Sequence, residues 1–153
     1  MRRCLFLDRD GVINAAPPKG EYIQGWDEFR LLRDVVSWIR LLIAAGFLAI
    51  VITNQRGIAL GRMTEADLAA LHERMRAELA AQGAVLDDIF YCPHAEDACD
   101  CRKPRPGMIV AAQKKWDIDL AGSLFVGDGE RDRLLAERCG MPFVMVRDGR
   151  VVG

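Results

Sequence analysis

The chain has 153 residues, of which 51% are hydrophobic and 28% are charged, and its formal net charge is -1. This length and hydrophobic content predict a single folded domain over residues 1–153 and exclude a disordered chain. The near-neutral charge provides no basic surface for nucleic acid, and no apolar run reaches the ~20 residues that a membrane span needs. The apolar run near the start is too short for a secretion signal, which favours a cytoplasmic protein.

Short apolar runs alternate with helical patterns along the chain, an order typical of a parallel sheet with helices on both faces. Strands are predicted over residues 4–8, 47–52, 89–91, 124–126 and 143–146. Helices are predicted over residues 34–46, 64–83, 108–116 and in a short segment that ends at residue 139. The fold class is therefore expected to be α/β, with a Rossmann-like, doubly wound, mostly parallel sheet.

Several of these elements carry boundary or surface signals. Asp34 is placed to cap the first helix, and Thr64 with Asp67 resembles a capping box at the start of the second. His72 lies off the apolar stripe of the second helix and is predicted to be a solvated surface histidine. Residues 14–30 are long enough for a functional loop, whose aromatic side chains either cover a site or anchor the loop to the domain.

The first strand stops at Asp8 and Asp10, two carboxylates that lie two positions apart. In an extended chain such residues project to the same side, and Gly11 then allows the backbone to turn. Two adjacent carboxylates repel each other unless a cation or a shared proton intervenes. A surface turn rich in Asp and Gly is the simpler interpretation of this segment alone.

Two other predicted strands also end in polar residues, which argues against a simple surface turn. Thr53 and Asn54 end the second strand, and Asp128 with Asp132 follows the fourth. Ligands of doubly wound sheets bind outside the carboxyl ends of the strands, so we expect these groups at one edge. Such an oxygen-rich set suits Mg²⁺, which also accepts substrate phosphate.

Arg102 and Lys103 precede a predicted helix, where cations and backbone amides together can bind an anionic group. These ingredients favour phosphoryl transfer. One carboxylate can attack phosphorus, while a second acid protonates the leaving oxygen and then activates water. A metal and the two cations would neutralise charge on the phosphoryl oxygens. The sequence has no Gly-x-x-x-x-Gly-Lys-Ser/Thr loop, so the P-loop mechanism lacks its parts.

Cys92, His94, Cys99 and Cys101 form the pattern Cys-x-His-x4-Cys-x-Cys. Three cysteines and one histidine are an accepted tetrahedral zinc set, and their clustering in a reducing compartment favours metal over disulfides. The alternative is a chance grouping of buried cysteines with a polar loop histidine. Because four ligands close the coordination shell, we expect structural zinc that holds the loop before the two cations in place.

Asp-x-Asp-Gly, a strand-terminal Thr, a Lys before a helix and Gly-Asp-x-x-x-Asp, in this order, resemble the haloacid dehalogenase superfamily of phosphatases over essentially the whole chain. The resemblance implies Asp8 as the nucleophile and Asp10 as the general acid/base. It also implies that Thr53 and Lys103 hold the transferring phosphoryl group. The implied Mg²⁺ ligands are Asp8, Asp128 and the backbone carbonyl of Asp10, with Asp132 supporting the site.

Asp-Arg-Asp-Gly at 8–11, Thr-Asn-Gln at 53–55 and the cysteine motif followed by Arg-Lys-Pro at 102–104 resemble one branch of that superfamily. This branch contains heptose-bisphosphate and histidinol-phosphate phosphatases, which lack a large cap domain, carry a zinc-bound loop and act on small phosphorylated metabolites. The resemblance implies Mg²⁺-dependent removal of the 7-phosphate of D-glycero-D-manno-heptose 1,7-bisphosphate through an aspartyl-phosphate. Histidinol phosphate is the alternative substrate.

Three departures from the heptose enzymes bear on the substrate. Leu60 stands where they usually carry Arg, Gly129 stands where a Lys often follows the metal-binding Asp, and the chain stops at Gly153, earlier than they do. A nucleic-acid 3′-phosphatase would need a basic surface, and a non-catalytic zinc module would not need four clustered carboxylates. We expect a monomer. The predicted substrate-binding residues are Asn54, Gln55, Arg56 and Arg102, with Arg56 a candidate to replace the missing cation.

Overall fold

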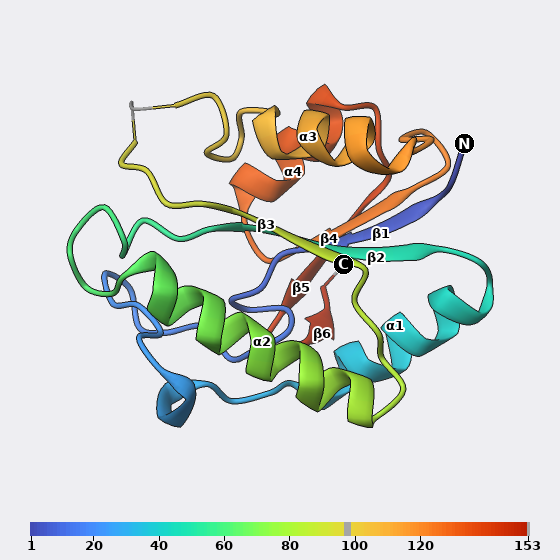
Figure 1. Ribbon diagram of the computed structural model, residues 1–153. Helices are drawn as coiled ribbons and strands as arrows, with labels where there is room; N and C mark the ends of the chain where they lie inside the picture. The colour runs from blue at the N-terminus through green and yellow to red at the C-terminus, as the bar shows by residue number, and fades with distance from the viewer. Residues whose placement is uncertain (97–98, 153) are drawn as a thin grey trace.

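The computed structural model describes residues 1–96 and 99–152, which form one six-stranded sheet in the order β3-β2-β1-β4-β5-β6 (Figure 1). The first five strands are parallel, and β6 pairs antiparallel with β5. The mostly parallel sheet is thus confirmed, whereas β6 is too short for its pattern to be recognised in the sequence. The strands are β1 (Cys4–Leu7), β2 (Leu48–Asn54), β3 (Asp88–Cys92), β4 (Leu124–Gly127), β5 (Phe143–Arg147) and β6 (Arg150–Val151).

Helices cover both faces of the sheet, as a doubly wound fold requires. Helices α1 and α2 lie on one side of the sheet and α3 and α4 on the other (Figure 1). Among the described residues no further domain covers the sheet edge, and no helix is long and apolar enough to cross a bilayer. The helices are α1 (Arg33–Ala44), α2 (Glu65–Ala81), α3 (Gly107–Trp116) and α4 (Glu130–Arg138), with a 3-10 turn η1 (Trp26–Glu28).

Strand β1 shows why the apolar runs are continuous. Leu5 and Leu7 pack into the core beneath α1 and α2, whereas Cys4 and Phe6 pack into the core beneath α3 and α4. A parallel strand covered on both faces has to be apolar at every position. The run therefore ends where the strand leaves the two helical layers, which is where the first carboxylates begin.

The helix boundaries confirm one prediction and correct another. Thr64 and Asp67 form the expected capping box, in which each side chain accepts a hydrogen bond from the other's backbone N–H. The predicted Asp34 cap was wrong, because Leu32 is the N-cap residue of α1 and makes no side-chain capping bond. Asp34 instead lies in the first turn, where a negative charge interacts favourably with the helix dipole.

Residues 14–30 connect β1 to α1, and both interpretations of this loop apply to different parts of it. The rings of Trp26 and Phe29 stack with centroids 4.8 Å apart and pack against the core beneath α1, which anchors the loop. Earlier in the loop, the Tyr22 hydroxyl accepts a hydrogen bond of 3.1 Å from Arg56 Nε, beyond the end of β2. That half of the loop therefore reaches the carboxyl edge of the sheet.

Candidate active site

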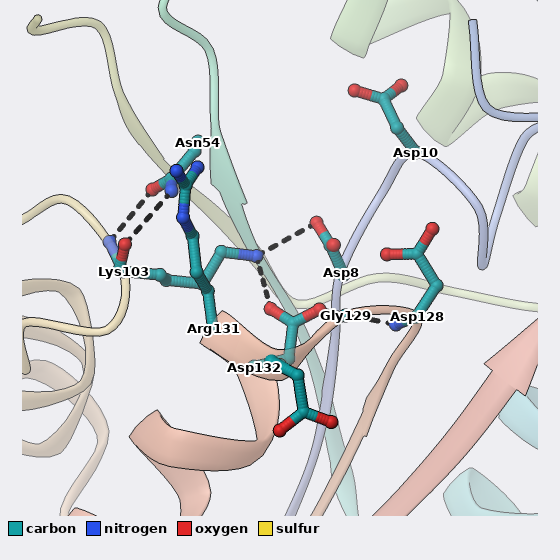
Figure 2. A pocket seen from close by; sticks show the side chains of 9 residues that line it. Asp8, Asp10, Asn54, Lys103, Asp128, Gly129, Arg131 and Asp132 are labelled. Atoms are coloured by element: carbon teal, nitrogen blue, oxygen red, sulfur yellow. Dashed lines mark hydrogen bonds and ion pairs between the residues drawn. The ribbon is translucent and has the colours of Figure 1, made fainter. Parts of the chain in front are cut away.

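The carboxyl ends of β1 and β4 lie side by side and carry acidic residues that surround Lys103 (Figure 2). The Lys103 ammonium donates to Asp8 Oδ1 at 3.0 Å, to Asp132 Oδ1 at 2.7 Å and to the Ile52 carbonyl at 3.1 Å. Three donors thus meet three acceptors, and the side chain is only 3% exposed. Asn54 fixes the backbone of this lysine, since its amide accepts from Lys103 N at 2.9 Å and donates to Lys103 O at 3.3 Å.

Carboxylates outnumber cations at this point. Asp8, Asp128 and Asp132 each offer an oxygen within 4.8 Å of the others, and the one ammonium between them leaves an excess of two negative charges when all are ionised. Burial and the charge of Asp132 raise the pKa of Asp8, and the same two causes raise the pKa of Asp128 to about 6. This oxygen-only, net-negative donor set fits a hard divalent cation such as Mg²⁺.

Two glycines permit the acids to approach so closely. A Cβ on Gly11, whose φ is +86°, would lie 1.9 Å from Asp128 Oδ2. A Cβ on Gly127 would lie 2.4 Å from the Asp132 Cβ. Gly11 therefore allows the turn that was predicted and also makes room for a carboxylate from the neighbouring strand.

Asp10 lines the same cavity, but Figure 2 shows its side chain turned away from Lys103. Its Oδ1 accepts from Arg9 Nε at 3.1 Å, from Arg9 Nη2 at 2.8 Å and from Asn14 Nδ2 at 2.9 Å. Burial alone would raise the pKa of Asp10, but Arg9, Asn14 and Gln55 together lower it below its ordinary value. The two carboxylates of the Asp-x-Asp motif therefore occupy opposite electrostatic surroundings.

Behind Asp10, the buried Arg9 side chain contacts His72 of α2. Arg9 Nη1 donates to His72 Nε2 at 3.0 Å, and the histidine is only 6% exposed. The prediction of a solvated surface histidine was wrong, because a charged side chain inside the domain provides this ring with a polar partner. Burial and then the charge of Arg9 lower the pKa of His72 to about 3, so the ring is neutral and accepts from Arg9.

Replacing His72 is expected to lower the free energy of unfolding at pH 7.5 and to change how that free energy depends on pH. His72→Leu leaves a buried Arg9 N–H without its acceptor, and we expect a loss of roughly 2 kcal/mol at pH 7.5. His72→Gln keeps an acceptor and should lose less. The folded-state pKa of about 3 lies below the unfolded value of 6.5, so the wild-type histidine's contribution is complete above pH 6.5 and declines as the pH falls.

Urea denaturation at pH 7.5 and pH 5 measures both effects. Between these pH values the wild-type protein should lose roughly 2 kcal/mol more than His72→Gln, since that variant has no group to protonate. Parallel pH profiles for the two proteins would contradict a buried, neutral His72.

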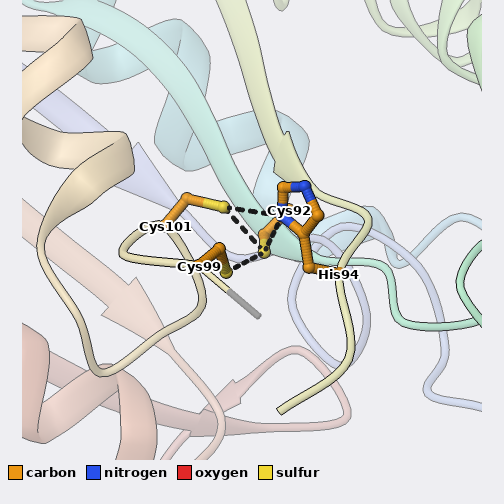
Figure 3. Close-up of side chains that lie close together, drawn as sticks. All are labelled: Cys92, His94, Cys99 and Cys101. Atoms are coloured by element: carbon orange, nitrogen blue, oxygen red, sulfur yellow. Dashed lines mark hydrogen bonds between the residues drawn. The ribbon is translucent and has the colours of Figure 1, made fainter. Parts of the chain in front are cut away.

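The four predicted zinc ligands converge in the loop after β3 (Figure 3). Cys92 Sγ lies 3.4 Å from Cys99 Sγ and 2.8 Å from Cys101 Sγ, and His94 Nδ1 lies 3.2 Å from Cys101 Sγ. All four ligand atoms fall within 4.8 Å of one another, and ligands of a tetrahedral zinc ion with bonds of ~2.3 Å lie roughly 3.8 Å apart. Burial raises the pKa of the Cys92 and Cys101 thiols and opposes ionisation of Cys99, but hydrogen bonds from its cysteine neighbours and the backbone lower the pKa of Cys99 to about 6. A bound metal ion would favour the thiolate form of all three.

A second cavity adjoins the acidic one and is lined by Arg56, Arg102 and Arg131, here called the arginine cluster. The acidic cavity measures about 460 Å³ and the second about 400 Å³, and Asn54 and Arg131 line both. Oε1 of Glu96 faces all three guanidinium groups, at 3.2 Å from Arg56, 4.0 Å from Arg102 and 3.9 Å from Arg131. Sequence reasoning missed Arg131, although its position between the two acids after β4 placed it at this edge.

Most predicted site residues therefore meet at one edge of the sheet, but not all of them line the acidic cavity. Thr53 and Gln55 are buried, and Gln55 Nε2 donates to Thr53 Oγ at 3.0 Å and to Asp10 Oδ2 at 3.3 Å. In this structure Gln55 contacts Asp10 and Thr53 contacts Gln55, and the contact of either residue with a substrate remains a prediction. The residues that line the acidic cavity are Asp8, Asp10, Asn54, Lys103, Asp128, Gly129, Glu130, Arg131 and Asp132.

Comparison with known proteins gives consistent matches. A family model described as HAD-hydrolase-like, for haloacid dehalogenase, matches residues 100–151. The chain is 43% identical over 149 residues to a D-glycero-beta-D-manno-heptose-1,7-bisphosphate 7-phosphatase of Pseudomonas putida, covering 97% of this chain and 84% of that protein. It is 40% identical over 157 residues to the enzyme of the same name from Escherichia coli, covering 97% and 81%.

A solved structure extends the comparison. A D,D-heptose 1,7-bisphosphate phosphatase from B. bronchiseptica, complexed with magnesium and phosphate, superposes with a TM-score of 0.87 at 37% identity. The superposition covers 96% of this chain and 83% of that one. The match therefore extends over the sheet, the helices and the edge that carries the acids.

Proposed function

The chain belongs to the haloacid dehalogenase family of phosphatases, which are phosphoric monoester hydrolases, and from this premise we propose that it removes the 7-phosphate of D-glycero-D-manno-heptose 1,7-bisphosphate. One observation carries the choice of substrate. A cavity lined by carboxylates adjoins a cavity lined by arginines, and Asn54 and Arg131 belong to both. A substrate with two phosphates can place the reacting one beside Asp8 and the other among the arginines.

The proposed catalytic steps use the roles that the family motif implies for Asp8 and Asp10. Asp8 attacks phosphorus and forms an aspartyl-phosphate as the bond to the sugar oxygen breaks. Asp10 has to take up a proton first, because its surroundings lower its pKa; it then donates that proton to the leaving oxygen and later takes one from the water that attacks the acyl phosphate. This second step releases inorganic phosphate and restores the Asp8 carboxylate and the protonated Asp10. Lys103, 3.0 Å from Asp8, is placed to hold the phosphoryl oxygens, and Thr53 is assigned the same role by the family motif.

Magnesium is the proposed cofactor at the acidic cavity. Asp8, Asp128 and the backbone carbonyl of Asp10 would hold it, with Asp132 supporting the site, and the ion would neutralise charge on the phosphoryl oxygens. The excess of negative charge among these carboxylates supports this assignment. A bound Mg²⁺ would also keep Asp8 ionised for attack despite its burial, since a cation lowers the pKa of an adjacent carboxylate.

The affinity for Mg²⁺ is expected to depend on pH. Asp128, with a pKa of about 6, is mostly protonated at pH 5 and must release its proton before it binds the ion. Addition of Mg²⁺ should therefore raise the melting temperature clearly at pH 8 and much less at pH 5. Thermal melts without Mg²⁺ and with about 5 to 10 mM Mg²⁺ measure this difference. An equal shift at both pH values would contradict a carboxylate site.

Zinc is the proposed structural metal at the cysteine cluster, and its loss should weaken catalysis indirectly. Cys99→Ser removes one ligand from the loop that leads directly to Lys103. We expect the melting temperature to fall by roughly 5 °C or more and kcat/KM to fall about 10- to 100-fold. Cys139→Ser is the matched control, since this half-buried cysteine lies outside the cluster. Full activity with an unchanged melting temperature and no bound zinc would refute the role.

The arginine cluster also helps to choose between the two candidate metabolites. Histidinol phosphate carries an ammonium group in place of a second phosphate, and three guanidinium groups would repel it.

Leu60 is exposed and does not line either cavity, whereas Arg131 lines both. Arg131 is therefore positioned to compensate for Gly129, which stands where related enzymes often carry Lys.

Phosphate release in the presence of Mg²⁺ tests the substrate. The panel contains both anomers of heptose 1,7-bisphosphate, histidinol phosphate, fructose 1,6-bisphosphate and a 3′-phosphorylated oligonucleotide. We expect kcat/KM for one heptose anomer to exceed that for every other compound by about 100-fold or more, as a site built for particular polar groups allows. A preference for histidinol phosphate would overturn the heptose assignment and leave the phosphatase family unaffected.

A further inference from the structure

Glu96 occupies the point on which the arginine cluster converges. One of its oxygens, Oε1, faces Arg56, Arg102 and Arg131 at once, and all four residues line the second cavity. The three arginines come from separate parts of the chain, namely the turn after β2, the segment that follows the cysteine cluster, and α4. A carboxylate therefore lies where an anionic group of a ligand would find three guanidinium partners.

This carboxylate satisfies the arginines poorly. It accepts one hydrogen bond, of 3.2 Å, from Arg56, and the distances of 4.0 Å to Arg102 and 3.9 Å to Arg131 are too long for hydrogen bonds. Arg102, 8% exposed, keeps a buried Nη1 that has no hydrogen-bond partner within the described parts of the chain. A buried N–H without an acceptor is costly, so the cluster favours an anion with more oxygens than Glu96 provides.

The exposure of Glu96 makes it easy to displace. Its side chain is 58% exposed, so solvent weakens its ion pairs with the arginines. When Glu96 moves out of the cluster, it loses one hydrogen bond, the one from Arg56. Arg56 is held independently by the Tyr22 hydroxyl at 3.1 Å from its Nε. Arg56 can therefore keep its position when the carboxylate moves away, and the burial of Arg102 restricts that side chain as well.

We propose that Glu96 is an internal competitor for the arginine cluster, which the second phosphate of a sugar bisphosphate displaces when the substrate binds. The inference rests on the proposed function, because it assigns the second cavity to the phosphate that is not cleaved. Glu96 is then a specificity-determining residue: it weakens the binding of bisphosphates and leaves compounds with only the reacting phosphate unaffected. The product still carries the second phosphate, so the same competition speeds its release.

The test compares wild-type protein with Glu96→Gln, which removes the charge and keeps the size. The substrates are heptose 1,7-bisphosphate and heptose 7-phosphate, which differ only in the second phosphate. We expect the KM for the bisphosphate to fall about three- to tenfold and the KM for the monophosphate to stay within about twofold. The inhibition constant of the product, heptose 1-phosphate, should fall by the same factor as the bisphosphate KM.

Glu137→Gln is the matched control, because it makes the same charge change at an exposed position of α4 away from both cavities. It should leave the ratio of the two KM values unchanged. A fall in both KM values together for Glu96→Gln would show a general charge effect and overturn the proposal. An unchanged or higher KM for the bisphosphate would also overturn it, the latter by showing that Glu96 holds the arginines in place.

A reporter assay separates this proposal from the choice of heptose. With p-nitrophenyl phosphate as substrate, heptose 1,7-bisphosphate and fructose 1,6-bisphosphate are tested as inhibitors beside their monophosphates. Glu96→Gln should lower the inhibition constants of the bisphosphates selectively, whichever sugar the enzyme prefers. If the inhibition constants of the bisphosphates fall selectively but heptose bisphosphate is not hydrolysed, the substrate is refuted and the role of Glu96 is supported. If heptose bisphosphate is hydrolysed but these constants do not fall selectively, the substrate is supported and the role of Glu96 is refuted.

Discussion

Asp8→Asn is expected to abolish phosphate release and leave the protein folded, with its zinc content unchanged. The amide cannot attack phosphorus, so kcat should fall on the order of 10⁴-fold or more. The substitution keeps the shape of the side chain and an oxygen that can accept from Lys103, which lies 3.0 Å from Asp8 Oδ1. Loss of activity would therefore report lost chemistry and not a damaged fold.

The stability of the same variant should rise in Mg²⁺-free buffer. Burial and Asp132 raise the pKa of Asp8 above its unfolded value, so the ionised carboxylate destabilises the folded state once the pH exceeds that value. Asparagine carries no charge, and the melting temperature should exceed that of wild type at pH 7.5 and approach it at pH 4.5. The buffer must contain no chelator, because a chelator would also remove zinc from the cysteine cluster.

Asp34→Asn is the control for this experiment, since it makes the same chemical change at an exposed position in the first turn of α1. It should retain full activity and change the melting temperature by no more than a degree or two. Measurable turnover by Asp8→Asn would mean that another group attacks phosphorus, and the assignment of the nucleophile would be wrong.

The features that sequence analysis predicted correctly are those that a short segment carries by itself. The polar ends of β1, β2 and β4 meet because parallel strands share one carboxyl edge, so Asp8 and Asp128 could be placed together without a structure. The cysteine cluster was recognisable from spacing alone, since its ligands lie close together in the chain. Gly11 was expected at a turn, although its contact with the Asp128 carboxylate was not.

The features that it missed depend on side chains from distant elements. His72 is buried because Arg9, from the turn after β1, reaches under α2, and the helical pattern alone contains no sign of this contact. Glu96 and Arg131 meet only because the cysteine loop and α4 pack at the same edge. Asn54 was predicted to bind substrate, yet its side chain also clamps the Lys103 backbone through two hydrogen bonds. Such pairings require the packed structure.

Lys103→Met is expected to damage both activity and stability. The variant lacks the cation that holds the phosphoryl oxygens, and kcat should fall about 10³-fold. It also leaves Asp8 and Asp132 buried without their shared ion-pair partner, which should lower the free energy of unfolding by about 3 to 5 kcal/mol. The deficit should shrink at low pH, because the raised pKa of Asp8 lets the folded state take up a proton.

Two further variants test whether buried charge is the cause. Lys103→Met combined with Asp132→Asn removes one of the stranded carboxylates, and should recover at least half of the lost stability with no recovery of activity. Lys115→Met deletes a lysine whose ion pair with Asp88 has the same 2.7 Å length as the pair between Lys103 and Asp132, but whose side chain is 60% exposed. It should cost less than about 1 kcal/mol, because solvent screens an exposed pair. Urea denaturation of all four proteins measures these differences, and equal losses from the two lysine substitutions would show that burial does not set the strength of the Lys103 pairs.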